Sequence, residues 1–574
     1  MDARRTTTLR ATEAPGGPGA APVGPLAGVG VCPGVAVGPV ARIGRPAEVP
    51  RDLPAPADPA AEVERVQAAL DAAADALDEA AEAARERGRE EAAEILDAQS
   101  MMAADPVLAD RAAALVTEGR PGAVAVTVAL DAFREQLVAQ GGYMAERAAD
   151  LDGLRHRVVA TLLGVPLPGL PEPGHPHVLV ADDLTPADTA TLDVAQVVGI
   201  VTALGGATSH TAIIARSLGI PAVVGCRGAM DLPDETPVLV DGRDGAVLPA
   251  PDGDEVARRR AEQEARAARA AAHHGPGRTA DGHAVKLLVN LGAGQAPEDA
   301  AAVDAEGVGL LRTELLYLDR PDAPTVDEQR AAYRRIFAAF AGRKVVVRTL
   351  DAGADKPLPF LTDPDEPNPA LGVRGYRTGR RHPELLDEQL RAIADAAEGS
   401  GAEVWVMAPM VSLPGEAAAF AAQVRGHGLP VAGTMVEVPA AALDAGRILD
   451  ACDFVSLGTN DLAQYAFAAD RLDHELADLL DVWQPVLLRL VATTATAGRA
   501  RAKPVGVCGE AAGDPLLAPV LVGLGVTSLS MAAASVPDVR AALAERTLEE
   551  CRALADAVLA APDAAAARQI ALGG

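Results

Sequence analysis

Several short apolar runs in the sequence end on residues that can do chemistry, among them GVGLLRTE, KVVVRTLD, GTMVEVP, VSLGTND and VGVCGE. The arginine side chain is a planar fork suited to phosphate or carboxylate oxygens, and glutamate and aspartate oxygens bind Mg2+ together with substrate phosphates. If the ends of these runs meet, they form a site for a small phosphorylated carboxylic acid and a magnesium ion. The residues concerned are Arg312, Glu314, Arg348, Asp351, Glu437, Asn460, Asp461, Cys508 and Glu510.

The same residues also allow a structural interpretation. Arg312 and Arg348 could pair with these carboxylates in a salt-bridge network. Cys508 could be a small buried apolar residue, as a lone cysteine usually is, although its place at the end of an apolar run leaves open a role as an acid.

His210 lies in a second stretch of interest, GGATSHTAIIARSLGIPAVVG. Two glycines allow a tight turn, and Thr208 and Ser209 can cap the helix that follows. His210 would then lie in the first turn of that helix, where backbone N–H groups and the helix dipole favour an anion. A phosphoryl group on His210 would be stabilised there, although a histidine at the start of a helix is structural about as often as it is functional.

The apolar runs also predict the element that positions the first group. From residue 284 onward, strand-like runs alternate with helical stretches: VKLLVNLG, GVGLLRTE, KVVVRTLD, EVWVMAPM, AGTMVEVP, DFVSLGTND, PVGVCGE and TSLSM. Eight buried parallel strands alternating with helices over roughly 280 residues are typical of a (β/α)8 barrel, whose active site lies at the C-terminal ends of the strands. The polar residues that end the runs should therefore meet on one rim.

The rest of the chain divides by its local sequence character. Residues 60–163 repeat apolar residues at helical spacing and predict a helical bundle, whose acidic surface is either simply solvated or docks a basic partner. Short apolar runs after residue 176 predict a small α/β unit. We therefore expect a multidomain α/β protein: a disordered extension (1–25), a small α/β domain (26–60 and 164–252), a helical domain (61–163), a linker helix (253–280) and a barrel (281–574).

The composition disfavours several classes of protein. The 574 residues carry 80 acidic and 51 basic side chains, and the net charge of −29 disfavours nonspecific binding to nucleic acid or anionic membranes. Five cysteines without a C-x-x-C pair support neither a disulfide framework nor a thiolate zinc site, and they fit a reducing cytoplasm. Neither an export signal nor a long uncharged apolar run is visible, so we expect no membrane insertion.

Taken in order, the motifs GGATSHTAIIARSLGIPAVVG, GLLRTELL, VVVRTLDAGADKPLPF, MVEVPAA, SLGTNDLAQYAFAADR and GVCGEAAGD resemble Enzyme I of the phosphoenolpyruvate:sugar phosphotransferase system. The resemblance extends from about residue 26 to about residue 560. It implies an enzyme that takes a phosphoryl group from phosphoenolpyruvate onto a histidine, releases pyruvate and passes the group to the phosphocarrier protein HPr. That relay would drive sugar import.

The resemblance also assigns roles to residues of this chain. His210 would attack phosphorus through Nε2, Thr189 would orient its ring, and Cys508 would protonate the enolate to give pyruvate. Other residues would hold phosphoenolpyruvate (Arg312, Arg348, Asn460 and Arg471) and Mg2+ (Glu437 and Asp461). Such a clamp suits phosphoryl transfer, which needs positioning and charge neutralisation more than covalent help.

The resemblance further implies how the parts cooperate. The α/β domain would swing between the barrel and the helical domain, where HPr docks, with hinges at residues 165–176 and 253–274. The acidic surface of residues 60–110 would steer a basic face of HPr. Because similar proteins dimerise through the barrel, we expect a homodimer here.

Two other functions are alternatives at this stage. Pyruvate phosphate dikinase and phosphoenolpyruvate synthase share the histidine and the barrel, but they need a large ATP-binding domain. The roughly 150 residues before the α/β unit are predicted to be helical and contain no glycine-rich phosphate loop. The second alternative is a catalytically silent scaffold, which the full set of rim residues disfavours.

Overall fold

The computed structural model describes residues 25–573 with short gaps, and these residues fall into two compact units, 25–264 and 265–573. Residues 1–24, which make up most of the predicted extension, lie outside the described residues. So do residues 45–48, 51, 87–89, 141–149, 166–168, 172, 185–187, 189–191, 207–209, 293–295, 319, 321, 353–357, 364–365, 367, 472–475, 477 and 574.

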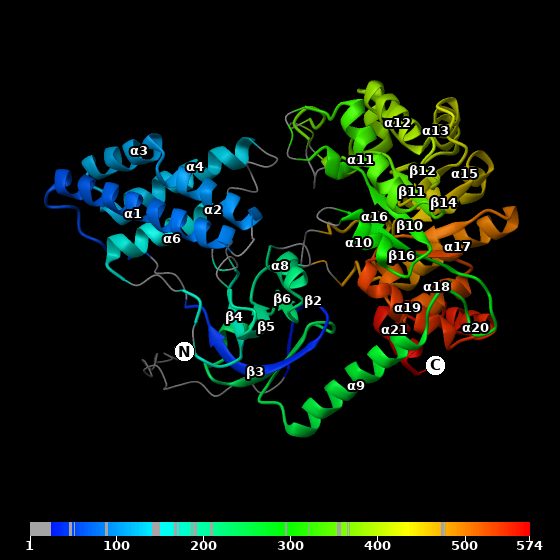
Figure 1. Ribbon diagram of the computed structural model, residues 1–574, viewed down its shortest axis with the longest axis horizontal. Coiled ribbons are helices and arrows are strands. Elements are labelled where there is room, and N and C mark those ends of the chain that lie inside the picture. Colours follow the sequence, from blue (N-terminus) through cyan, green and yellow to red (C-terminus); the bar gives the residue numbers. More distant parts are fainter. Residues whose placement is uncertain are drawn as a thin grey trace, which may run out of the picture. The chain divides into compact units, whose positions relative to one another are not determined.

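The helical part of the first unit packs around one apolar core (Figure 1). In its first helix the buried residues Val66, Leu70, Ala73 and Leu77 recur every three or four positions, which is the spacing of one helix face. That face packs against the other helices. The helices are α1 (Pro59–Glu86), α2 (Glu90–Ala103), α3 (Pro106–Thr117), α4 (Gly122–Gln140) and α6 (Asp150–Leu163).

The α/β part of the first unit is built on a mixed sheet with the strand order β1-β8-β7-β3-β4-β5-β6-β2. Strands β3 to β6 are parallel to their neighbours in that series, and the outer strands pair antiparallel. Helix α8 (His210–Leu218) connects β5 to β6 and buries Ala212 and Ala215 against the sheet. The strands are β1 (Leu26–Ala27), β2 (Val29–Cys32), β3 (Val35–Arg42), β4 (His177–Ala181), β5 (Val197–Thr202), β6 (Ala222–Val224), β7 (Pro237–Asp241) and β8 (Ala246–Pro249).

The second unit contains a closed barrel of parallel strands, which confirms the predicted (β/α)8 architecture. Each of the eight predicted runs supplies one strand. The strands are β9 (Lys286–Leu291), β10 (Gly307–Arg312), β11 (Lys344–Arg348), β12 (Glu403–Ala408), β13 (Ala432–Val436), β14 (Phe454–Leu457), β15 (Val505–Val507) and β16 (Ser528–Met531).

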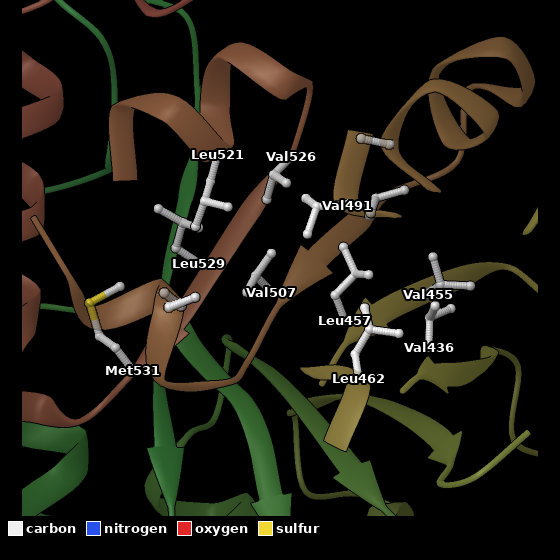
Figure 2. Close-up of a cluster of buried hydrophobic side chains, with 14 of the residues drawn as sticks. Val436, Val455, Leu457, Leu462, Val491, Val507, Leu521, Val526, Leu529 and Met531 are labelled. Carbon is white, nitrogen blue, oxygen red and sulfur yellow. The ribbon is translucent and has the colours of Figure 1, made fainter. Parts of the chain in front are cut away.

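Helices of the second unit cover the outside of this barrel (Figure 1). Figure 2 shows part of the apolar cluster between strands and helices, where Val455 lies beside Val436 and Val507 lies near Val491. The barrel interior is apolar as well and contains Met407 and Met435. The helices are α10 (Pro297–Ala302), α11 (Val326–Ala339), α12 (Pro383–Ala397), α13 (Pro414–Gly426), α14 (Pro439–Leu443), α15 (Ala445–Ala451), α16 (Thr459–Phe467), α17 (Pro485–Arg501), α18 (Ala518–Leu524), α19 (Val536–Ala544), α20 (Leu548–Leu559) and α21 (Ala564–Gly573).

Helix α9 (Gly253–Ala272) falls within the segment predicted as a linker helix and has no buried residue. Within the second unit, Arg266 of this helix pairs with Asp538 at 2.6 Å. Within the first unit, Arg259 pairs with Asp241 and Asp244, each at 3.0 Å. In the part of the chain that the structure describes, no helix combines the length and the apolar character needed to cross a membrane.

Candidate active site at the barrel rim

The predicted rim residues of the second unit gather at the C-terminal ends of the barrel strands. Arg312 and Arg348 are the last residues of β10 and β11 and lie side by side in the strand register. The other rim residues follow their strands directly: Glu437 after β13, Cys508 after β15, and Asn460 and Asp461 in the first turn of α16 after β14. Arg471 lies beyond the end of α16, and its Nη1 is 3.4 Å from Asp461 Oδ2.

Arg348 is the centre of a buried ion-pair network. Its Nη2 is 2.6 Å from Glu314 Oε1, and its Nη1 is 2.9 Å from Asp351 Oδ2. The Arg348 side chain is 9% exposed and that of Glu314 is 1% exposed. Burial by itself lowers the pKa of Arg348, but the neighbouring carboxylates outweigh burial and raise the pKa above the ordinary value. The positive charge is therefore fixed, and the salt-bridge network that was the alternative interpretation is part of the site.

Arg374 joins this network to the metal-binding candidates. It is 4% exposed, with Nη2 3.5 Å from Asp351 Oδ1 and Nη1 3.3 Å from Asp461 Oδ1. Its Nη1 also donates to the Tyr465 hydroxyl at 3.2 Å. Tyr465 lies four residues after Asp461 on α16, so one helix face presents both groups to the same arginine.

Glu437 is completely buried, and its two carboxylate oxygens differ. Oε1 accepts a hydrogen bond of 2.5 Å from the Met410 backbone N–H. Oε2 has no hydrogen-bond partner within the described residues. Burial, followed by repulsion from Asp461 and Asp351, raises the pKa of Glu437 to about 8.

These carboxylates fit a divalent cation that binds together with substrate. A Cβ atom at Gly458 would lie 2.9 Å from Glu437 Oε2, so the glycine keeps the space beside that oxygen open. No group of three histidine, cysteine or acidic side chains suited to a metal occurs among the described residues. Mg2+ is commonly held by one or two carboxylates plus substrate phosphate oxygens, so the pair Glu437 and Asp461 is sufficient when substrate supplies the rest.

Cys508 is buried just below these charges. Its Sγ lies 3.5 Å from the Leu457 carbonyl oxygen, and the side chain packs among the interior residues of the barrel. Burial raises the pKa of the Cys508 thiol to about 11; Ser456, Arg348 and Arg312 oppose this rise, and Glu437 adds to it. The thiol therefore carries its proton at neutral pH and is able to donate it.

The remaining residues predicted for the site are Asn460, His210 and Thr189. Asn460 Oδ1 accepts from the Glu510 backbone N–H at 3.2 Å. His210 is the first residue of α8, as its sequence context predicts, and it belongs to the first unit and not to the barrel. The side chain of His210 and the whole of Thr189 lie outside the described residues.

Family models for PEP-utilising enzymes match three stretches of the chain. The N-terminal model matches residues 27–147, the mobile-domain model matches residues 173–245, and the PEP-binding-domain model matches residues 266–548. The matches therefore cover both the helix start with His210 and the rim of the barrel.

Relatives of known class align with nearly the whole chain. A phosphoenolpyruvate-protein phosphotransferase from Streptomyces coelicolor is 51% identical, and the match covers 89% of this chain and 92% of the relative. The chain belongs to the Enzyme I family. A phosphoenolpyruvate-protein phosphotransferase from Haloferax volcanii is 42% identical, with 84% of this chain and 87% of that protein covered. A multiphosphoryl transfer protein from Xanthomonas campestris is 41% identical, with 81% of this chain and 57% of that protein covered.

As a member of the Enzyme I family, the chain is a phosphoenolpyruvate-dependent phosphotransferase. Sequence reasoning missed two residues of its site, Arg374 and Tyr465. Neither stands at the end of an apolar run: Arg374 lies between β11 and α12, far past the end of the strand, and Tyr465 lies in the second turn of a helix. The four-residue spacing from Asp461 to Tyr465 was the one signal in the sequence that pointed to a shared face.

Proposed function

We propose that this enzyme transfers the phosphoryl group of phosphoenolpyruvate to His210 and then to HPr, releasing pyruvate, as the first step of sugar uptake by the phosphotransferase system. The observation that carries this proposal is the buried rim cluster, in which fixed arginine charges surround a carboxylate oxygen that has no hydrogen-bond partner among the described residues. Such a cluster is costly to bury and gains its stabilisation when an anion and a cation arrive together.

The rim brings arginines and carboxyl groups together before any ligand binds. The arginines are Arg312, Arg348, Arg374 and Arg471, and the carboxyl groups near them include Glu314, Asp351, Glu437 and Asp461. Mg2+ held by Glu437 and Asp461 would add the positive charge that a phosphorylated carboxylate requires. Arg312 and Arg348 would hold the phosphate, and Asn460 and Arg471 would fix the rest of the substrate.

The chemistry then divides between the two units. The bond between phosphorus and the enol oxygen breaks while a bond from phosphorus to His210 Nε2 forms, and the start of α8 favours the anion that results. We propose that Thr189 orients the ring. Cys508 Sγ gives its proton to the methylene carbon of the enolate, which forms pyruvate, and the thiolate regains a proton from water.

Docking of HPr is proposed for the helical part of the first unit. Met101 of α2 and Val107 of α3 are 74% and 63% exposed, which is unusual for apolar residues of this size. The nearby helix α1 carries the exposed acidic residues Asp71, Asp75 and Asp78. An apolar centre beside acidic side chains suits a carrier whose docking face is apolar and basic.

A homodimer in the cytoplasm completes the proposal. Leu371, Leu413 and Leu443 are strongly exposed and lie on the successive connections that follow β11, β12 and β13. These apolar residues on neighbouring connections favour an interface on that side of the barrel. All five cysteines are free and buried, as suits a reducing compartment.

The test is incubation of the purified chain with phosphoenolpyruvate labelled on phosphorus, with Mg2+ and without ATP. We expect the label to appear on His210 and to pass to HPr. His210→Ala should abolish labelling, whereas the control His175→Ala, which changes an exposed histidine of the same unit, should not. A requirement for ATP would support a dikinase instead, and an unlabelled wild-type protein would support a scaffold.

The docking proposal has its own test. Charge reversal of Asp71, Asp75 and Asp78 should slow phosphorylation of HPr at low salt and matter less at high salt. Met101→Lys should slow phosphorylation of HPr at both low and high salt. Unchanged transfer to HPr in both variants would contradict docking on this surface, while autophosphorylation of His210 would serve as the control that the site is intact.

A further inference from the structure

Two polar side chains on the neighbouring barrel strands β16 and β9 form a chain of hydrogen bonds that ends on Cys508 after β15. The Ser530 hydroxyl of β16 donates to Asn290 Oδ1 at 2.6 Å. Asn290 of β9 in turn donates from Nδ2 to the Cys508 carbonyl oxygen at 3.1 Å. The Cys508 side chain packs among apolar interior residues such as Leu310, Met407 and Met435, and Asn290 is half-buried.

The direction of each bond follows from the chemistry of the groups. The Cys508 carbonyl only accepts, so the NH2 group of Asn290 must face it. Asn290 Oδ1 therefore faces Ser530, whose hydroxyl must be the donor. The three groups are thus locked in a single arrangement.

The bond to Asn290 holds a carbonyl that lies just past the end of strand β15. Strand β15 pairs with β16 only as far as Val507, which lies opposite Leu529. Cys508 is the next residue, and its carbonyl leaves the ladder at that point. On the opposite side the Cys508 N–H donates to the Leu457 carbonyl oxygen of β14 at 3.0 Å. The backbone of Cys508 is therefore held at its N–H group from β14 and at its carbonyl group from β9.

The neighbouring strand leaves room for this arrangement. A Cβ atom at Gly309 of β10 would lie only 2.4 Å from Ser530 Oγ and 2.5 Å from Ser530 Cβ. Any side chain at this position would displace Ser530 and with it the hydrogen bond to Asn290. The glycine therefore supports the same polar chain from a third strand.

We propose that Asn290 and Ser530 are positioning residues that aim the Cys508 thiol at one face of the enolate. This inference rests on the proposed role of Cys508 as the proton donor. Proton transfer needs the donor within hydrogen-bond reach of the carbon, and a peptide free to rotate at Cys508 would carry Sγ away from that point. When the thiol is misdirected, enolpyruvate leaves the site and takes its proton from water on either face.

The test uses phosphoenolpyruvate that carries deuterium at one methylene position, with the full-length chain in tritiated water. Wild-type enzyme should give pyruvate whose methyl group has one configuration. Asn290→Leu, which keeps the volume but removes both hydrogen bonds, should give a mixture of configurations and lower kcat by about 100-fold, the low end of what general acid catalysis contributes. The KM for phosphoenolpyruvate should change little, because the arginines are untouched.

Further variants separate positioning from general damage. Ser530→Ala should give a partial loss of configuration, and the double variant Asn290→Leu with Ser530→Ala should be no worse than Asn290→Leu alone, because both remove one chain of bonds. Ser528→Ala removes a hydroxyl two residues earlier on the same strand and should behave as wild type. Barrel folding is checked by tryptophan fluorescence, since Trp405 and Trp483 both lie in the second unit.

The outcomes are distinguishable from those of the proposed function. If Asn290→Leu and Ser530→Ala both retain a single methyl configuration and wild-type kcat, the positioning role is wrong while the role of Cys508 stands. If Cys508→Ala also retains both, the proton donor itself is misassigned. If Asn290→Leu fails to fold, Ser530→Ala decides alone, because loss of a single hydroxyl is a much smaller change.

Discussion

The two ends of the barrel use the same kinds of ion pair for opposite purposes. At the C-terminal end the pair of Arg348 and Glu314 is almost completely buried, whereas at the N-terminal end the Lys286 side chain is 61% exposed in its 2.7 Å pair with Glu306. Glu306 Oε2 also accepts from the backbone N–H groups of Gly277 and Leu287, so this carboxylate connects the start of β10 to β9 and to the segment before it. The difference teaches that the partly exposed pair connects neighbouring segments of the chain, while the buried pair lies where we propose that the substrate binds.

Burial also shifts ionisation at both ends, with opposite sign. It raises the pKa of Glu437 to about 8 at the C-terminal end. At the N-terminal end, burial lowers the pKa of Lys344 to about 8, and the Lys344 ammonium lies 3.2 Å from the centre of the Trp405 ring. In each case the low dielectric disfavours the charged form.

The largest effect is expected from breaking the buried pair. Arg348→Met removes the buried arginine that pairs with both Glu314 and Asp351 and should lower the free energy of unfolding by about 3–5 kcal/mol. Lys286→Met should cost at most about 1 kcal/mol, as exposed pairs do. Urea unfolding followed by tryptophan fluorescence measures both. Equal losses of unfolding free energy in Arg348→Met and Lys286→Met would contradict the distinction between the two ends of the barrel.

The next effect concerns Glu437 and pH. Between pH 4.5 and about 8 the carboxyl is protonated in the folded protein and ionised in the unfolded chain, so the folded state binds more protons and the metal-free protein loses stability as pH rises. Glu437→Gln should remove this slope. In the same window, affinity for Mn2+ should rise about tenfold per pH unit, because binding requires the carboxylate. Calorimetric titration measures it, and a flat profile would contradict the raised pKa.

Lys344 should show the reverse dependence at higher pH. Between about pH 8 and 10.5 the unfolded chain keeps the proton that the folded protein has lost, so this residue makes the protein more stable as pH rises. The difference in urea midpoint between wild type and Lys344→Met should therefore change across that window, whereas Lys286→Met should show no such change. The activity of Lys344→Met should stay near the wild-type value at neutral pH.

The smallest effects are expected at two alanines in the left-handed backbone region. Ala468 (φ 52°) follows α16 and Ala502 (φ 51°) follows α17. Glycine removes a steric cost of about 1 kcal/mol at such positions, so both substitutions should raise the melting temperature slightly. Ala468→Gly should also raise the KM for phosphoenolpyruvate about twofold, because it frees the segment that carries Arg471. Ala502→Gly is the matched control.

Much of this architecture could be predicted from the sequence, because its signals are local. All eight strands of the barrel are compact apolar runs, and the last residues of those runs gave Arg348, Glu437 and Cys508. Arg374 was not predictable in this way, since it lies between β11 and α12 and not at the end of a strand. The role of Asn290 was not predictable either. It is an isolated polar residue within an apolar strand, and its partner Ser530 is 240 residues away in the sequence.

Met410 shows how the site is held in shape. This residue has φ 60°, a conformation that costs an L-residue about 1–2 kcal/mol, and there its N–H meets Glu437. A glycine would adopt the same turn more cheaply but would also let it relax. A glycine at position 410 would therefore stabilise the fold, and we expect it to weaken the binding of the Mg2+ that Glu437 is proposed to hold.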